Sequence, residues 1–126
     1  MNYTTIEQSK RLLELGLSPE SADMCYVPIA NIPGEYSPEI NVWGNDIWIE
    51  NPDNWIPCWS IGALIGLFPK SSFEKQIVWL QPQENGYTCH FKNEVTIIRD
   101  DLIDAVFDMV VLLLEHEMLY ETRRLR

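Results

Sequence analysis

The segment that decides the fold is QIVWLQPQENGYTCHFKNEVTIIRDDLIDAVFDMVVLLLE, residues 76–115. It begins with two runs of strand character, QIVWLQ and GYTCHFK, which flank Pro82–Asn85 and predict a β-hairpin. Residues 95–98 add a short third strand. Because side chains alternate along a strand, one face of the second run carries Tyr87, Cys89 and Phe91. The segment therefore predicts a small antiparallel sheet directly before a helix.

That helix is predicted over residues 101–120, with Asp100 as its N-cap and with acidic residues in its first turns, where the helix dipole favours them. Its core-facing positions are 102, 103, 106, 107, 110, 113 and 114. The run MVVLLL, residues 109–114, widens this apolar stripe almost around the helix. Other elements of the chain cover this stripe on two sides, or a second subunit does. The second alternative predicts a homodimer through the C-terminal helix.

The N-terminal residues predict a pair of helices. Thr4 and Thr5 both start capping boxes, and Gly16 supplies a stop signal. Ser18-Pro19-Glu20 then restarts a helix, because serine caps it and proline suits its first position. Residues 5–24 are thus expected to form two helices joined by a tight turn.

The middle of the chain is rich in proline, which excludes long helices between Val27 and Pro57. EINVW and IWIE, around Gly44–Asp46, predict another hairpin. Ser60 is the expected N-cap of a short central helix, IGALIGLF, ended by Pro69. Gly62 and Gly66 on this helix predict close packing against a sheet.

The fold class is accordingly α+β, in a single domain over residues 1–126. We expect an N-terminal helix pair and two β-hairpins that form one small antiparallel sheet. A central short helix and a long C-terminal helix packed on that sheet complete the prediction.

The charge distribution narrows the classes of partner. The formal net charge is −10, and no Lys or Arg occurs between Leu12 and Pro69. Direct binding to nucleic acid or to an anionic membrane is therefore disfavoured. The chain shows neither a secretory signal nor an apolar run long enough to span a membrane, and its three widely spaced cysteines fit reduced thiols, so we expect a cytoplasmic protein.

The acidic middle of the chain is also rich in tryptophan, and it carries the predicted binding residues. Exposed tryptophans beside carboxylates are typical of partner-binding surfaces. Trp55 and Trp59 are assigned to the core, and the binding residues are Trp43, Trp48, Glu50 and Asp53. This pattern favours a protein-interaction module with a basic protein partner. An acidic surface that imitates DNA is a weaker alternative, because imitation does not require tryptophan or proline.

A second hypothesis places chemistry at Cys58, two residues before the Ser60 cap, because a thiol near helix N–H groups can become a nucleophile. A thiol-dependent enzyme or a redox-responsive protein would use it. However, neither His90, in a predicted strand, nor His116, near the end of the last helix, is placed by the sequence to act as its base. A cysteine packed in a corner with Trp55 and Trp59 is the favoured interpretation, so a non-enzymatic role is preferred and the Cys58 enzyme is kept as the alternative.

No sequence motif indicates a metal or a cofactor. Asp101, Asp104 and Asp108 share one face of the last helix, a spacing that would suit a divalent ion, but a solvated face is the commoner outcome. Cys89 and His90 are adjacent in a strand and point to opposite faces. We therefore expect no metal site and no cofactor.

The segment Ile-Pro-Cys-Trp-Ser, residues 56–60, followed by a leucine-rich helix, resembles a family of small proteins from gut bacterial genomes and their phages or mobile elements. The similarity extends over the N-terminal helices and the C-terminal helix. It implies a cytosolic accessory protein of phage or mobile-element origin, and no catalytic residue follows from it.

Overall fold

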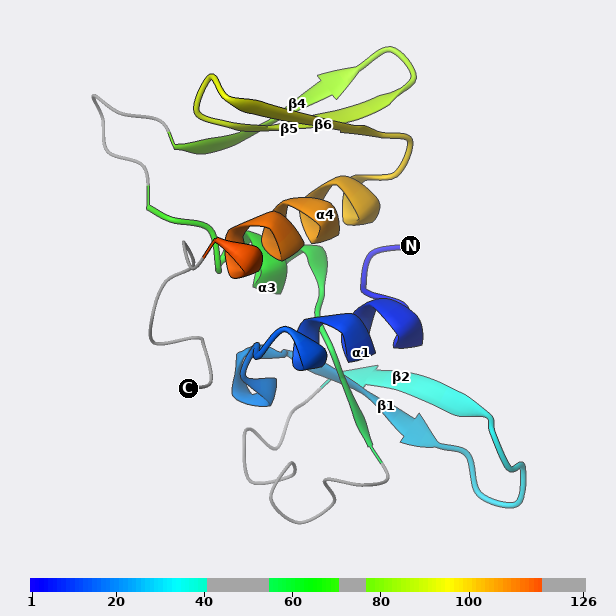
Figure 1. Ribbon diagram of the computed structural model, residues 1–126. Helices are drawn as coiled ribbons and strands as arrows, with labels where there is room; N and C mark the ends of the chain where they lie inside the picture. Colours follow the sequence, from blue (N-terminus) through cyan, green and yellow to red (C-terminus); the bar gives the residue numbers. More distant parts are fainter. Residues whose placement is uncertain (41–54, 71–76, 117–126) are drawn as a thin grey trace.

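The computed structural model describes residues 1–40, 55–70 and 77–116 of the chain. Two small sheets lie at opposite ends of the molecule, and the helices lie between them (Figure 1). The helical elements are α1 (Ile6–Glu14), the 3₁₀ turn η1 (Pro19–Ser21), α3 (Ile61–Ile65) and α4 (Leu102–Glu115). This layered α+β arrangement confirms the predicted fold class.

The first of the two sheets comes from the segment that the sequence marks most clearly. Its strands are β4 (Val78–Gln83), β5 (Gly86–Phe91) and β6 (Val95–Arg99), in the antiparallel order β4-β5-β6. Gln83 pairs with Gly86, so the loop between β4 and β5 has two residues, and Gly86 takes a positive φ of 146° that only glycine adopts without strain. The predicted hairpin and third strand are confirmed, although Pro82 lies within β4 and not in the loop.

The second sheet joins segments that are distant in sequence. It consists of β1 (Met24–Pro28), β2 (Tyr36–Ile40) and β3 (Ile56–Cys58), in the antiparallel order β2-β1-β3. The central strand, β1, therefore pairs with its hairpin neighbour on one side and with a segment some thirty residues later on the other. The N-terminal residues extend the edge beyond β3 through an isolated bridge between Tyr3 and Ser60.

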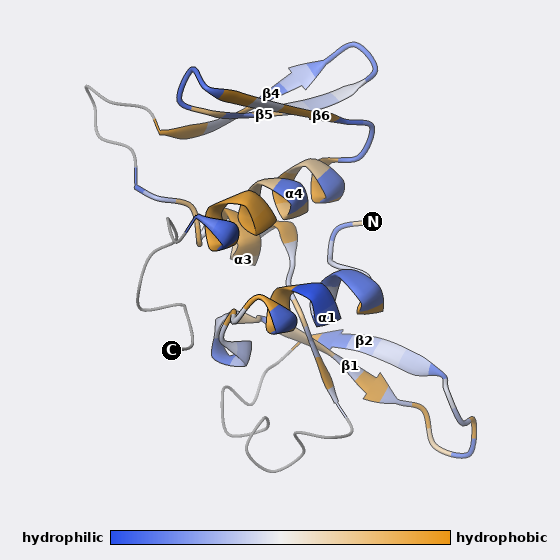
Figure 2. Ribbon diagram, in the orientation of Figure 1, coloured by the Kyte–Doolittle hydropathy of each residue, from blue (hydrophilic) through white to orange (hydrophobic). Residues whose placement is uncertain are grey.

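The core surrounds α4, which is strongly apolar along its length (Figure 2). The helix packs against β5 and β6 on one side and against α3 on another. The buried residues that belong to this cluster and lie outside α4 come from α1 and the segment after it, from α3 and the residues on either side of it, and from β5: Leu12, Leu17, Ala22, Trp59, Leu64, Leu67, Cys89 and Phe91. The wide apolar stripe of α4 is thus covered by the chain itself. The homodimer through this helix stays a prediction, with few exposed side chains on α4 to support it.

Three parts of the predicted architecture need correction. The strands form two separate sheets and not one. The second N-terminal helix is a single 3₁₀ turn, because the chain becomes extended at Ala22 and the Asp23 carboxylate accepts hydrogen bonds from the Ser60 backbone and hydroxyl instead of the chain continuing a helix. α4 begins one residue later than expected, with Asp101 at the N-cap position and no side-chain capping bond.

The predicted hairpin around Gly44–Asp46 falls almost wholly on residues 41–54, outside the described residues. Its first two residues, Glu39 and Ile40, belong to β2, whose hairpin partner is β1. The prediction that Gly62 and Gly66 pack against a sheet is wrong: both line a hollow together with Ser21 and Asp23, and in the described part of the chain no strand atom lies within 4 Å of where their Cβ atoms would be.

Candidate functional site

The corner at Cys58 is closed by the N-terminal segment of the chain. The Cys58 side chain is fully buried, and its Sγ lies 3.8 Å from Thr4 Oγ1 and 3.5 Å from the Thr4 carbonyl oxygen. The Tyr26 hydroxyl donates to that same carbonyl at 2.6 Å. Thr4 Oγ1 also accepts from the Trp59 backbone N–H, 3.1 Å away. Cys58 is therefore a packed side chain, as the favoured interpretation of the sequence predicted.

The surroundings of Cys58 disfavour its thiolate form. Burial raises the pKa of the Cys58 thiol to about 11, and this effect outweighs hydrogen bonds from Thr4 and Tyr26 that lower the pKa. A nucleophilic cysteine has the opposite shift. The helix after the Ser60 cap, α3, is only five residues long, so its dipole does little to stabilise a Cys58 thiolate.

The other two cysteines are buried as well. Burial raises the pKa of Cys89 to about 12, and it also raises the pKa of Cys25, with a smaller contribution from the Glu39 carboxylate. No two of the three form a disulfide. The hydrogen bonds and ring contacts of the described residues link His90 to Thr96 and Trp79, and link no histidine to Cys58.

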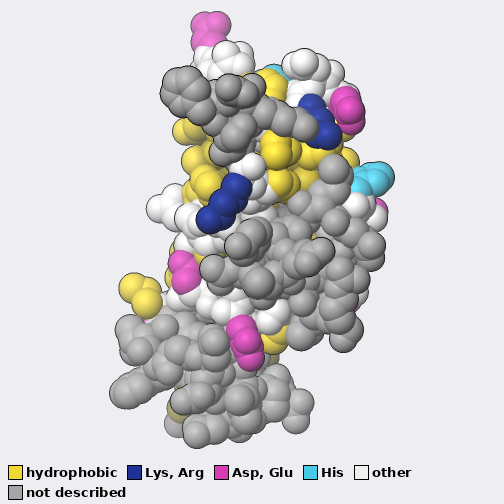
Figure 3. Space-filling model, turned by 90° about the vertical axis from the view of Figure 1, so that its left-hand side faces the viewer, with side chains coloured by type: hydrophobic (Ala, Val, Ile, Leu, Met, Phe, Trp, Pro, Cys, Tyr) yellow, Lys and Arg dark blue, Asp and Glu magenta, His cyan; other side chains and the backbone are white. Residues whose placement is uncertain are grey.

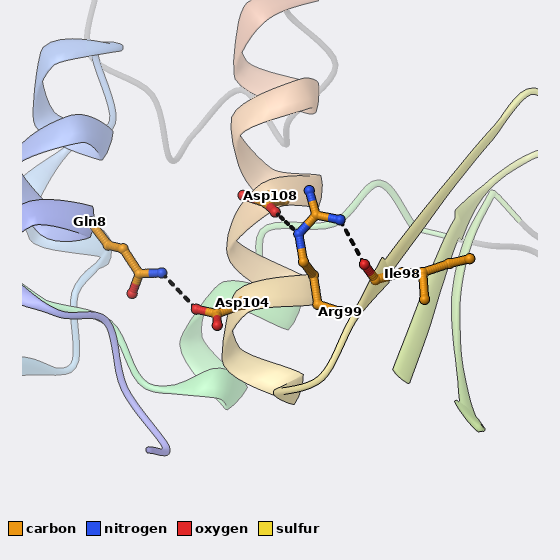
Figure 4. A network of polar contacts seen from close by, with 5 residues as sticks. All are labelled: Gln8, Ile98, Arg99, Asp104 and Asp108. Carbon is orange, nitrogen blue, oxygen red and sulfur yellow. Dashed lines mark hydrogen bonds and ion pairs between the residues drawn. The ribbon is translucent and has the colours of Figure 1, made fainter. Parts of the chain in front are cut away.

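The carboxylates on α4 are used to connect elements. Asp104 accepts a hydrogen bond from the Gln8 side chain of α1 at 2.9 Å, and Asp108 pairs with Arg99 Nε of β6 at 2.7 Å (Figure 4). The Arg99 guanidinium also donates to the Ile98 carbonyl, 2.6 Å away. Within the described ranges, no group of three or more His, Cys, Asp or Glu residues could hold a metal ion. The aspartate row therefore holds α1 and β6 against α4.

The β1–β2 hairpin extends away from the helices (Figure 1), and three of its apolar side chains are exposed. Ile29 and Ile32 in its loop are 39% and 49% exposed, and Ile40 at the end of β2 is 70% exposed. The loop consists of two successive turns that lead the chain into β2. Asn31 and Gly34, one in each turn, take positive φ angles. We call Ile29–Ile40 the hairpin arm.

The hairpin arm has carboxylates but no cations. The backbone carbonyl of Glu35 closes the loop by accepting from the Ile29 N–H at 2.9 Å, and the Glu39 carboxylate accepts from the Ser37 hydroxyl at 2.9 Å. The arm lies within the stretch between Leu12 and Pro69 that contains no Lys or Arg. It is thus an apolar and acidic surface.

The predicted binding residues Trp43, Trp48, Glu50 and Asp53 lie outside the described residues. They follow the hairpin arm directly in sequence. The two tryptophans assigned to the core are described: Trp59 is fully buried, with its indole N–H donating to Ser21 Oγ at 2.9 Å, and Trp55 is partly buried against Cys25. Sequence reasoning missed the exposed isoleucines of the arm, although their position around the turn residues Asn31 and Pro33-Gly34 was a usable signal.

A hollow of about 220 Å³ lies between the β5–β6 turn and the end of α4. Its lining is Phe91, Lys92, Glu94, Val95, Leu112 and His116. Figure 3 shows one face of the molecule on which hydrophobic side chains gather, with basic, acidic and histidine side chains near them. The hollow combines an apolar floor with groups of both charges and with an imidazole, so it does not favour one ligand class.

Comparison with known proteins gives no match: no family model fits the sequence, and neither a curated protein nor a solved structure is significantly similar to it. The function must therefore be argued from the chain itself. In the parts of the chain that the structure describes, no helix is both long and apolar enough to cross a membrane.

Proposed function

We propose that this protein is a non-enzymatic protein-interaction module that binds a partner with a basic and partly apolar surface. The observation that carries the proposal is the hairpin arm, which exposes Ile29 and Ile32 in its loop and Ile40 at the end of β2, on a segment that also carries Glu35 and Glu39. Apolar side chains that project from a small domain are typical of binding surfaces, and neighbouring carboxylates add selectivity for cations.

The binding surface in this proposal continues along the chain into Trp43, Trp48, Glu50 and Asp53. These residues follow β2 without an intervening cation. Large aromatic side chains often contribute most of the binding free energy in an interface, while rim carboxylates mainly raise the association rate. A basic partner would therefore meet apolar anchors within an acidic surround.

The proposal includes a cytoplasmic location and an accessory role of phage or mobile-element origin. Three buried, unpaired thiols suit a reducing compartment. The resemblance carried by residues 56–60 supports the origin. An enzyme that uses Cys58 is the alternative, and the raised pKa of a fully buried thiol weighs against it.

Affinity capture tests the binding role. The tagged protein and the double variant Ile29→Ser/Ile32→Ser are compared in a bacterial lysate at low and high salt, and captured proteins are quantified by mass spectrometry. We expect a basic partner that binds the unmodified protein, is lost by at least tenfold from the double variant, and weakens with salt because screening reduces the charge attraction.

Ile65→Ser is the matched control, because Ile65 is 39% exposed, as Ile29 is, and lies in α3, outside the hairpin arm. It should capture the same partner as the unmodified protein. Capture that is equal for the double variant, or no specific capture at all, would contradict the proposal. Labelling of the native protein with a thiol reagent tests the alternative: we expect Cys58 to react only after denaturation.

A further inference from the structure

The two sheets have four edge strands, and three of these carry a proline. Pro38 lies in β2, Pro57 in β3 and Pro82 in β4, whereas β6 has the sequence Val-Thr-Ile-Ile-Arg. Proline has no N–H, so its effect on a sheet edge depends on which way its nitrogen points. The register of each strand answers that question.

In the β2-β1-β3 sheet the prolines point outward. The Ile29 N–H donates to the Glu35 carbonyl, and since hydrogen-bonded pairs alternate along an antiparallel ladder, Val27–Ser37 and Cys25–Glu39 are the bonded pairs that follow. Pro38, opposite Tyr26, therefore directs its nitrogen to the free edge. The same alternation applied across β1 makes Cys25–Pro57 a pair without hydrogen bonds, so Pro57 also faces outward.

In the β4-β5-β6 sheet the same rule separates the two edges. The Lys92 N–H donates to the Ile77 carbonyl at 2.7 Å, which makes Pro82–Tyr87 a pair without hydrogen bonds and turns Pro82 outward. On the other side of β5, the residues of β6 bonded to it are Val95, Ile97 and Arg99. Thr96 and Ile98 therefore direct their N–H groups away from the sheet.

Among the strands of the described residues, the outer edge of β6 is thus the one edge of the four on which no proline removes a donor. No backbone partner is found for the N–H groups of Thr96 and Ile98 among the described residues. The Ile98 side chain beside them is 64% exposed. Unblocked edges of this kind pair readily with another strand, and proteins commonly protect them with proline or charge.

We infer that the free edge of β6 is a strand-pairing site and that its occupant is β6 of a second copy of this chain, which makes a twofold-symmetric dimer with one continuous six-stranded sheet. The pairing is antiparallel about Ile97, so Thr96 of each copy lies opposite Ile98 of the other and all four outward N–H groups gain acceptors. The exposed isoleucines become covered in the same step.

Charge complementarity favours a second copy as the occupant. Antiparallel pairing about Ile97 places Arg99 of one copy opposite Val95 of the other, one residue in sequence from its Glu94. The Arg99 guanidinium then attracts that Glu94 while its Nε stays paired with Asp108 of its own chain, and twofold symmetry repeats the attraction. The bond from Arg99 to the Ile98 carbonyl is compatible with the pairing, because a carbonyl oxygen accepts two hydrogen bonds.

The test is the mass of the protein in solution, measured by light scattering and sedimentation in about 0.15 M salt, where the repulsion between two acidic chains is screened beyond about 8 Å. We expect twice the 14.7 kDa of one chain, with a dissociation constant below about 1 mM. In the variant Ile98→Pro, which has a proline facing outward as in the other three edges, dissociation should become about thirtyfold more favourable, because symmetry removes two hydrogen bonds.

Ile98→Thr is the matched control: it keeps the N–H and should retain most of the dimer. Amide hydrogen exchange provides a second measurement on the unmodified protein, in which the Thr96 and Ile98 N–H groups should become protected as the concentration rises. A monomer at every concentration would overturn the inference. So would a dimer that a folded Ile98→Pro variant leaves unchanged, or exchange at Thr96 and Ile98 that does not depend on concentration.

Discussion

The β4-β5-β6 sheet and the β2-β1-β3 sheet have the same number of strands but different kinds of support. β5 places Cys89 and Phe91 in the main core against α4. β1 contributes Cys25 to a small separate cluster, and its position depends on hydrogen bonds such as that from Tyr26 to the Thr4 carbonyl. One sheet is stabilised mainly by apolar burial, and the other also depends on polar links to the N-terminal residues.

The difference also separates stability from function in our proposal. The sheet on α4 buries Cys89 and Phe91 of its central strand against the helix and exposes Ile98 on an edge strand, whereas the other sheet extends a hairpin arm with exposed isoleucines away from the core. A binding surface requires apolar residues that folding leaves unburied. The polar links fix the root of the arm without covering its end.

The largest expected change in the free energy of unfolding is in α4, which supports the β4-β5-β6 sheet. Leu113 is fully buried in α4, so Leu113→Ala should lower the free energy of unfolding by about 3–4 kcal/mol, through lost burial and the cavity left behind. Urea unfolding followed by circular dichroism measures it. Leu102→Ala, at a half-buried position of the same helix, should cost clearly less. Equal costs would show that α4 does not have the core position described.

The second-largest change in stability is expected at the polar links between the N-terminal residues and the β2-β1-β3 sheet. Thr4→Val keeps the shape of the side chain but leaves the Trp59 N–H without its acceptor and the buried Ser9 hydroxyl without its partner, 2.8 Å away. Two stranded polar groups should cost about 2–4 kcal/mol. Thr96→Val, at an exposed threonine that bonds only to His90 among the described residues, is the control and should cost less than about 1 kcal/mol. A neutral Thr4→Val would remove the polar contrast between the sheets.

The success of sequence reasoning follows the same division. The β4–β5 hairpin, β6 and the stripe of α4 were predicted because their signals are local: turn residues between two runs of strand character, alternation along the second run, and helical periodicity. The β2-β1-β3 sheet was not, because YSPEI of β2 lacks clear alternation and β3 pairs with β1 across some thirty residues. The Thr4–Cys58 contact joins residues 54 positions apart, and no local pattern encodes it.

Candidate residues divide in the same way. Burial of Cys58 and Trp59 was predictable from their apolar neighbours, and the Ser60 cap from its position before a leucine-rich run. The use of Asp104 and Asp108 was not, because their partners come from α1 and β6. The outward direction of the edge prolines required the register, since in sequence they read as breaks between strands.

The loss of stability at alkaline pH tests the burial of one thiol in each sheet, Cys58 and Cys89. The pKa of Cys58 rises from 9 to about 11 on folding, so the unfolded chain releases this proton first and the free energy of unfolding falls as the pH rises between those values. Each fully shifted thiol contributes about 1.4 kcal/mol per pH unit. Below about pH 8 the stability should not depend on these groups.

Alanine variants of the two cysteines show how much of this fall in the free energy of unfolding comes from each sheet. Cys58→Ala should remove the part that ends near pH 11, and Cys89→Ala the part that continues to about pH 12, because Cys89 has apolar surroundings without the hydrogen bonds that favour the Cys58 thiolate. Urea unfolding at a series of pH values gives both slopes. A slope unchanged in both variants would show that the thiols are not buried as described.

The smallest expected change in stability is at Ser60, which connects α3 to the β2-β1-β3 sheet. The Ser60 hydroxyl accepts the Ala63 N–H at 3.1 Å and so caps α3, while it donates to the Asp23 carboxylate beside β1. Ser60→Ala removes both bonds and should cost about 1 kcal/mol, the usual cost of a lost cap. Ser60→Thr keeps a hydroxyl and should cost less. In the alanine variant, amide exchange should accelerate in α3 and at the start of β1 together. Acceleration confined to α3 would mean that the bond to Asp23 does not hold the second sheet in place.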